Sequence, residues 1–457
     1  MRILYAIHDF LPRHRAGSEI YAFELAREFT RRADVAILAA EYDPSVPHGT
    51  IRWRDYAGLT VIELVNNWQF RRFDESYSSE RINVQLNHVL DATAPDVLHI
   101  HNLLNLSFDL PRLAKERGIA TVATLHDYTL VCPSGGQRVH VAESHVCESI
   151  DTDRCARCFN QSALSLQIRA GRLTEGRTGR ILGRAARAMY RLAPGVATSA
   201  MRSIDGPDVS GNDIRRRLAY ARQVFEAIDL FVAPSASMAA EFCRLGVPRD
   251  RIQISDYGFR GASTECRHAG DDHPLRIGFV GTLVWHKGVH VLVEAAKGLR
   301  GSFAVQIHGD TGVFPDYVAA VRTAAAGVPV TFAGGFDQNQ KSEVYSGLDV
   351  LVVPSLWPEN SPLVIHEAFM HHVPVVAARV GGVPELVVDE VSGLLYEAFS
   401  ADSLRRALQR LIDDRALLRT LSERAPAVKS IEQDAAEWDE RYRTVRALPR
   451  AEVRAWS

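Results

Sequence analysis

Two glutamates stand eight residues apart in the segment 354–368, which reads PSLWPENSPLVIHEA. The apolar run DVLVV before it is typical of a buried strand, so Glu359 is expected in the loop after that strand and Glu367 in the following helix. One carboxylate could then bind sugar hydroxyls and the other ribose hydroxyls, while the start of the helix offers N–H groups to a diphosphate. Without further context, a capping residue and a surface charge give the same spacing.

A lysine lies in a comparable place, in the segment GTLVWHKGVHVL that follows the apolar run LRIGFV. From a loop after a strand, the ammonium of Lys287 can neutralise a departing diphosphate. Near the start of the chain, Gly17 lies where a strand gives way to a helix, so that the backbone can approach an anion closely at the helix N-terminus. A simple strand-to-helix turn has the same sequence pattern. No GxGxxG follows any predicted strand, which weakens a dehydrogenase interpretation.

Four of the six cysteines fall within one loop-like stretch that ends in CxxC. Four thiolates suit a tetrahedral structural zinc, or less well an iron–sulfur cluster, and binding would order the loop. Free thiols or regulatory disulfides are the alternatives. The four predicted metal ligands are Cys132, Cys147, Cys155 and Cys158.

The elements that must position these residues are short apolar runs separated by helix-like segments. Such runs occur near residues 3, 35, 97, 121 and 230, and the pattern restarts near 275 with LRIGFVG, FAVQIHG, PVTFAGG, DVLVVPS and PVVAA. This alternation predicts two doubly wound α/β domains, each with a mostly parallel sheet. We expect an acceptor-side domain over 1–265, with the cysteine loop at 132–158, and a donor-binding domain over 266–430. A C-terminal helix within 431–457 is expected to pack back across the junction.

Composition narrows the class of partners. The 457 residues carry 53 basic and 55 acidic side chains, a net charge of -2. The net charge therefore does not attract the chain to nucleic acid or to an anionic membrane, and we expect neither as a partner on this ground. No run approaches the roughly 18 to 20 apolar residues of a membrane span, and MRILYAIHDF turns polar too soon for a signal peptide, which predicts a soluble, cytoplasmic protein. The stretch 163–222 is rich in arginine and helix-like. It is either a binding surface or an ordinary solvated helix face. As a binding surface it would contact an anionic acceptor or the headgroups of a membrane, which would place the protein peripherally at the inner face.

The segment after the two glutamates continues HHVPVVAARVGGVPELVVDEVSGLLY, with Gly381, Gly382 and Glu385 after a further strand. In this order and spacing, the chain resembles the retaining glycosyltransferases of family 4, which have the GT-B fold. The resemblance covers nearly the whole chain and is strongest over 275–400. It implies two Rossmann-like domains facing across a cleft, and transfer of a hexose from a UDP-, GDP- or dTDP-sugar to a glycan or lipid-linked acceptor, with retention and with no cofactor in the chemistry.

The resemblance also implies roles for single residues. Glu367 would hold the ribose, Glu359 would lie beside the donor hexose, and Lys287 would stabilise the leaving diphosphate. His126, which follows the run ATVATL, would point at the donor sugar. The residues expected to offer backbone amides to the diphosphate or sugar are Asn360, Ser361 and Leu363.

One position departs from the family pattern. The family usually has an arginine where Thr282 stands, so one of two phosphate cations is missing, with His286 as one candidate to replace it. Two other functions stay open: a sugar-nucleotide epimerase or hydrolase on the same fold, and a non-catalytic scaffold that binds a sugar nucleotide or a partner protein.

Overall fold

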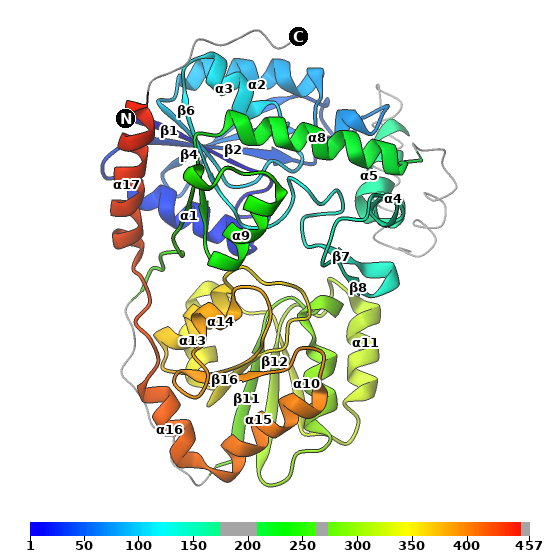
Figure 1. Ribbon diagram of the computed structural model, residues 1–457, viewed down its shortest axis with the longest axis vertical. Coiled ribbons are helices and arrows are strands. Elements are labelled where there is room, and N and C mark those ends of the chain that lie inside the picture. Colours follow the sequence, from blue (N-terminus) through cyan, green and yellow to red (C-terminus); the bar gives the residue numbers. More distant parts are fainter. Residues whose placement is uncertain (174–207, 262–272, 449–457) are drawn as a thin grey trace. The chain divides into compact units, whose positions relative to one another are not determined.

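The computed structural model describes residues 1–173, 208–261 and 273–448. These residues form two compact units. The first comprises Met1–Pro234, Ala239–Gly258 and Ile431–Ser457, and the second comprises Ser235–Met238 and Phe259–Ser430. Each is built on one large sheet (Figure 1).

The first unit contains an eight-stranded sheet in the order β10-β9-β6-β5-β1-β2-β4-β3, parallel except for the β3–β4 pair. Helices α2, α3 and α8 cover one face, and α1 and α17 lie on the other (Figure 1). Helices on both faces explain why β1 is buried from its second residue to its end. Its strands are β1 (Arg2–Ile7), β2 (Asp34–Glu41), β3 (Ile51–Tyr56), β4 (Leu59–Val65), β5 (Val97–Ile100), β6 (Ala120–Thr124), β9 (Leu230–Ala233) and β10 (Ile252–Ile254).

The helices of the first unit connect these strands, apart from the last one. Helix α17 follows the whole second unit in sequence and packs on α1 and β6. A small hairpin, β7 (Val139–His140) and β8 (His145–Val146), lies in the cysteine loop. The helices are α1 (Gly17–Phe29), α2 (Glu80–Thr93), α3 (Leu110–Glu116), α4 (Thr152–Gln161), α5 (Ala163–Leu173), α8 (Gly211–Ala227), α9 (Ala236–Leu245) and α17 (Ile431–Ala447). The first turn of α9, up to Met238, is assigned to the second unit.

The second unit contains a six-stranded, all-parallel sheet in the order β13-β12-β11-β14-β15-β16. The strand order reverses between β11 and β14, which is the point where doubly wound sheets bind ligands at the carboxyl ends of their strands. The strands are β11 (Leu275–Val280), β12 (Phe303–His308), β13 (Val330–Gly334), β14 (Val350–Val353), β15 (Val375–Ala378) and β16 (Gly393–Tyr396). The helices are α10 (Val289–Ala296), α11 (Pro315–Ala324), α12 (Lys341–Ser346), α13 (Leu363–Met370), α14 (Val383–Leu386), α15 (Ala401–Asp413) and α16 (Arg415–Glu423).

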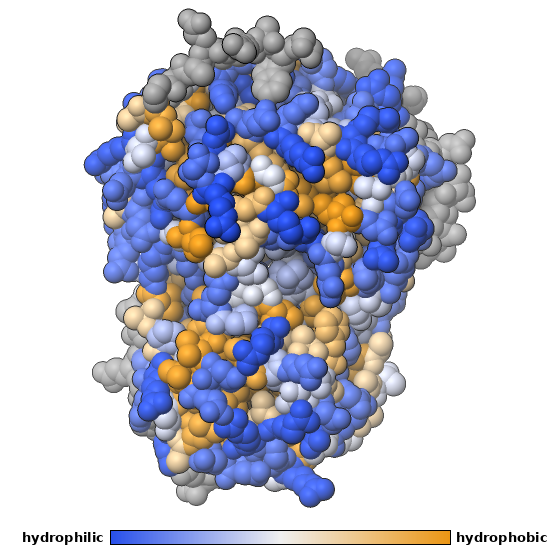
Figure 2. All heavy atoms as spheres, in the orientation of Figure 1, coloured by the Kyte–Doolittle hydropathy of each residue, from blue (hydrophilic) through white to orange (hydrophobic). Residues whose placement is uncertain are grey.

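The two sheets confirm the predicted fold class of two doubly wound α/β domains. Of the arginine-rich stretch, the structure describes α5 and α8, whereas half of its arginines fall within 174–207 and lie outside the described residues. Within the described ranges, no helix combines the length and the apolar character needed to cross a membrane. Hydrophilic and hydrophobic residues are mixed over the visible face of each unit (Figure 2).

Candidate functional site

An ion pair lies at the strand-order reversal of the second unit. Lys287 ends a short 3-10 turn after β11, and Glu359 lies in the loop after β14, so the topology brings the two side chains to one sheet edge. The Nζ of Lys287 is 2.6 Å from Oε1 of Glu359, and the hydroxyl of Ser355 donates to the same oxygen at 2.7 Å. The Glu359 side chain is 3% exposed, so its charge depends on these partners. The structure therefore brings together a cation and a carboxylate that the sequence placed in two separate loops.

Two aromatic side chains surround Lys287. Its Nζ lies 5.3 Å from the centre of the Trp357 ring. This cation–π contact holds the lysine side chain in addition to the ion pair with Glu359. His286 is buried, and burial lowers its pKa to about 4, so it is neutral at pH 7 and does not supply the cation missing at Thr282. The ring nitrogens His286 Nδ1 and Trp357 Nε1 are both buried without a hydrogen-bond partner among the described residues.

Glu367 lies on α13, and both of its carboxylate oxygens are occupied by α12. Lys341 Nζ lies 2.6 Å from Oε1, and the Tyr345 hydroxyl donates to Oε2 at 2.7 Å. Burial and this carboxylate raise the pKa of the Tyr345 phenol well above its usual range. A ribose diol that bound Glu367 would therefore have to compete with Lys341. Neither partner could be predicted from the sequence, because only the placement of α12 beside α13 brings Lys341 and Tyr345 to Glu367.

The Gly-Gly turn after β15 holds the acidic loop from behind. Gly381 has φ +52, and a Cβ there would lie 2.1 Å from the carbonyl oxygen of Glu359. A Cβ on Gly382 would lie 2.0 Å from the carbonyl oxygen of Asn360, and the Gly382 amide donates to the Glu359 carbonyl at 2.7 Å. Only glycine fits this close approach of two backbones. This explains why the Gly-Gly turn and the acidic loop occur together in the sequence.

The expected backbone donors at the start of α13 differ in their surroundings. The amide of Ser361 donates to Oδ1 of Asn360 at 2.6 Å, and the Ser361 hydroxyl lies 2.9 Å from His366 Nε2. Leu363 is the first residue of α13, where a helix leaves its N–H groups without intrahelical acceptors. The contact of these amides with a diphosphate stays a prediction.

The first unit also gathers polar side chains at the carboxyl ends of its strands. Asp9 follows β1, and Gly17 is the first residue of α1. Glu19 is 2% exposed, accepts from the amide of Ala16 at 3.0 Å and lies 3.3 Å from His8 Nε2. Burial, followed by the charges of neighbouring carboxylates, raises the pKa of Asp9 to about 7. These acidic groups were missed by the sequence reasoning, which treated this loop only as a glycine turn.

His126 lies at the end of β6 with both ring nitrogens engaged. Its Nε2 is 2.9 Å from Nδ1 of His101, and its Nδ1 is 2.9 Å from the Tyr257 hydroxyl. Burial lowers the pKa of His126 to about 3, so the ring is neutral at pH 7. A hydrogen bond from this ring to a sugar would replace one of the two contacts, and the expected sugar contact stays a prediction.

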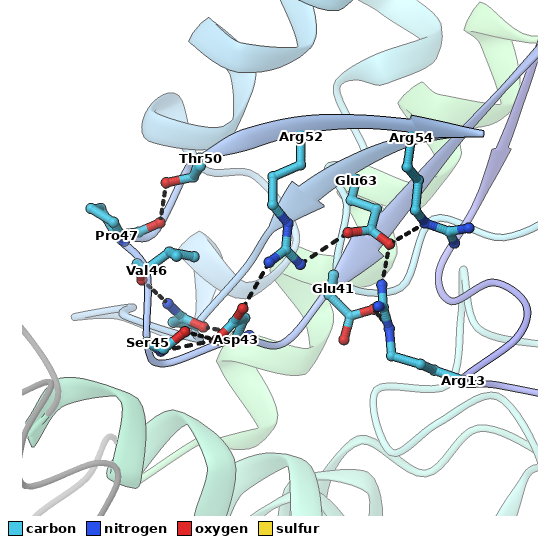
Figure 3. Close-up of polar contacts among 11 residues, drawn as sticks. Arg13, Glu41, Asp43, Ser45, Val46, Pro47, Thr50, Arg52, Arg54 and Glu63 are labelled. Atoms are coloured by element: carbon cyan, nitrogen blue, oxygen red, sulfur yellow. Dashed lines mark hydrogen bonds and ion pairs between the residues drawn. The ribbon is translucent and has the colours of Figure 1, made fainter. Parts of the chain in front are cut away.

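A charge network fastens the loop between β1 and α1 to the sheet (Figure 3). Glu63, on β4, pairs with three arginines: Arg13 of the loop, Arg52 Nη2 at 2.9 Å and Arg54 Nε at 2.5 Å. Arg54 also donates to the carbonyl oxygen of Leu11 at 2.6 Å. The guanidinium of Arg54 thus holds Glu63 with its Nε and the loop with its Nη2.

The cysteines require a correction. Cys155 and Cys158 lie one turn apart on α4, and the pKa of Cys155 is raised to about 12 by burial and then by the charges of Cys132, Cys147 and Cys158. Across the described residues, however, no group of three or more His, Cys, Asp or Glu side chains is placed to hold a metal ion. The predicted metal centre is not formed: the four thiols are free, and Cys158 Sγ lies 3.8 Å from the carbonyl oxygen of Val139.

Comparisons with known families match both halves of the chain. The model of "Glycosyl transferases group 1" matches residues 267–428, and the model of "Glycosyltransferase Family 4" matches residues 15–156. Alpha-D-kanosaminyltransferase of Streptomyces kanamyceticus is 30% identical over 186 residues, which is 39% of this chain and 48% of that protein. The chain spans about half the length, or less, of the curated relatives it matches first.

Two solved structures share the fold over nearly the whole chain. Sucrose-phosphate synthase of Thermosynechococcus elongatus superimposes with a TM-score of 0.64 at 18% identity, covering 97% of this chain and 98% of that one. Anabaena Alr3699/HepE in complex with UDP gives a TM-score of 0.64 at 16% identity, covering 96% and 100%. At these identities, the likeness establishes the fold.

Proposed function

The chain belongs to the family 4 glycosyltransferases, and on that premise we propose that it transfers a hexose, with retention, from a nucleoside-diphosphate sugar to a hydroxyl of a glycan or lipid-linked acceptor. The observation that carries the proposal is the Lys287–Glu359 pair at the strand-order reversal of the second unit. Such a point is where doubly wound sheets bind nucleotides, and the pair offers a cation for phosphate beside a carboxylate for hydroxyls. The products would serve polysaccharide or glycoconjugate synthesis.

The donor would be held by three groups of the second unit. Lys287 would turn from Glu359 toward the diphosphate, and the N-terminus of α13 would add backbone N–H groups and the positive end of its dipole. Glu359, released from the ammonium, would accept hydrogen bonds from hexose hydroxyls. Glu367 would accept those of the ribose in place of Lys341 and Tyr345. The position of Thr282 supplies no second cation, so Lys287 would carry most of the leaving-group stabilisation.

Retention would follow from attack on the face that the diphosphate leaves. The bond from C1 to the diphosphate oxygen breaks while the acceptor oxygen bonds to C1 on the same face, and the acceptor proton passes to the departing phosphate oxygen. No enzyme nucleophile takes part in this scheme, and the neutral ring of His126 would orient the hexose rather than remove a proton.

UDP-sugars are the first donors to test, because HepE binds UDP on the same fold, with GDP- and dTDP-sugars as alternatives. A thermal-shift screen detects the donor, since a ligand at 100 times its Kd stabilises the fold by about 2.7 kcal/mol. We expect one nucleotide class to raise the Tm and its sugar to be consumed only when an acceptor is added. Consumption without acceptor would instead indicate an epimerase or hydrolase, and binding without any turnover would indicate a scaffold.

A further inference from the structure

The C-terminal helix α17 contributes polar side chains to the interior of the first unit. Asp434, Trp438 and Tyr442 are each exposed by 1% or less, and α17 packs on α1 and β6 (Figure 1). A buried carboxylate is costly unless hydrogen bonds compensate it. The partners of Asp434 therefore indicate what this helix is holding in place.

Asp434 fixes two groups with one oxygen. The Tyr21 hydroxyl donates to Oδ2 at 2.8 Å, and the amide of Gly258 donates to the same atom at 3.1 Å. The indole N–H of Trp438 donates to the Tyr21 oxygen at 3.0 Å. The Tyr21 hydroxyl thus has both a donor and an acceptor partner on α17, which sets its direction.

Tyr257 connects this arrangement to His126. It precedes Gly258, whose amide Asp434 holds, and its ring centre lies 4.6 Å from that of Tyr21. On its other side, the Tyr257 ring stacks on His126 at 5.4 Å with 17° between the planes, and its hydroxyl is 2.9 Å from Nδ1. Both the backbone and the ring of Tyr257 are therefore positioned by groups that contact α17.

The hydrogen bonds also select one tautomer of His126. His101 is 3% exposed, its Nδ1 meets His126 Nε2, and its own Nε2 is buried without a partner among the described residues. A buried N–H without an acceptor is rarer in proteins than an acceptor without a donor. The His101 proton therefore belongs on Nδ1, where it is donated to His126 Nε2. His126 then carries its proton on Nδ1 and donates it to the Tyr257 oxygen.

We propose that Tyr257 and Asp434 are positioning residues for His126, fixing the plane and the tautomer of its ring at the carboxyl end of β6, so that the C-terminal helix acts on His126 through Asp434. The consequence for catalysis rests on the proposed function, in which His126 orients the donor hexose. The positioning itself does not depend on it.

Long-range proton–nitrogen NMR spectra of protein labelled with ¹⁵N-histidine test the positioning directly. The His126 signals are identified by their loss in His126→Asn, and we expect the wild-type ring in the Nδ1–H form. Tyr257→Phe removes the acceptor at Nδ1, so the proton signal of Nδ1–H should move upfield, while Nε2 keeps the hydrogen bond that it accepts from His101. Asp434→Asn should move this signal in the same direction by less. If Asp434→Asn does not fold, Tyr21→Phe removes the same hydrogen bond from the other side.

Kinetics add a second readout and a matched control. We expect kcat to fall about tenfold in Tyr257→Phe with the donor KM within about twofold, because the ring is displaced while the nucleotide contacts remain. Tyr442→Phe removes a buried hydroxyl of the same helix that meets His99 Nδ1 at 2.6 Å and makes no hydrogen bond to His126. This control should keep both the tautomer and kcat.

Two results would overturn the proposal: an unchanged His126 ring in both Tyr257→Phe and Asp434→Asn, or an equal fall of kcat in Tyr442→Phe, which would mean a general loss of packing. A protein without transferase activity but with the expected NMR shifts would refute the proposed function and leave the positioning intact.

Discussion

Replacing Lys287 by Met should destabilise the second unit, because it leaves the buried carboxylate of Glu359 without its cation. The Glu359 side chain is 3% exposed, and of the donors Lys287 and Ser355 only the Ser355 hydroxyl would remain. Breaking a fully buried ion pair costs about 3 to 5 kcal/mol, and the 28% exposure of the Lys287 side chain lowers that figure. We therefore expect a loss of about 2 to 3 kcal/mol. The double variant Lys287→Met/Glu359→Gln removes both charges and should recover at least half of it.

Urea denaturation of wild type, both single variants and the double variant measures this coupling as a double-mutant cycle. The matched control is Lys297→Met, which breaks a 2.7 Å pair with Glu294 at a site where the two side chains are 42% and 61% exposed. Exposed pairs are worth about 0 to 1 kcal/mol, so this control should unfold close to wild type. The reasoning fails if Lys287→Met is as stable as the control, or if the double variant is less stable than Lys287→Met alone.

Three further predictions concern the site. Glu367→Ala should abolish the thermal shift produced by the donor, since it removes the carboxylate proposed to hold the ribose, and an undiminished shift would exclude Glu367 from the nucleotide site. Asp9→Asn should raise Tm by an amount that grows between about pH 4 and pH 7. The pKa of Asp9 is raised to about 7, so the folded protein binds the Asp9 proton more tightly than the unfolded chain does. The protonated carboxyl therefore stabilises the wild-type fold by up to about 4 kcal/mol, and this contribution is lost as the pH rises. A pH-independent difference in Tm between Asp9→Asn and wild type would contradict the raised pKa. Gly381→Ala should lower the free energy of unfolding, measured by urea denaturation, by at least about 2 kcal/mol. The new Cβ would lie 2.1 Å from the Glu359 carbonyl oxygen, on a backbone of positive φ. An unchanged free energy of unfolding would show that the acidic loop does not depend on this turn.

The strands, and the places of Lys287 and Glu359 after two of them, could be predicted from the sequence because they depend on local patterns. Continuous apolar runs of four to six residues mark strands buried on both faces, and residues just after such runs meet at one sheet edge. Lys287 and Glu359 each follow a strand, so their meeting needed only the strand order. The pairing of Glu367 with Lys341 and Tyr345 could not be predicted, because it depends on how α12 packs beside α13.

The surroundings of His126 were out of reach for a different reason. Its partner Tyr257 is 131 residues away, and Asp434 reaches the same region only because the chain returns to the first unit after building the whole second one. The cysteines show the opposite error. Their spacing predicted a shared metal, but spacing along a loop does not fix where the sulfur atoms point, and the described thiols are not arranged as a metal site.

The anomeric configuration of the product tests the central claim most directly. The protein is incubated with an α-linked sugar nucleotide and a panel of glycan and lipid-linked acceptors, and the coupling constant of the new anomeric proton is read by ¹H NMR as soon as product forms. Front-face displacement by a family 4 glycosyltransferase predicts an α-linked product. A β-linked product, or release of the free sugar in place of any transfer, would contradict it.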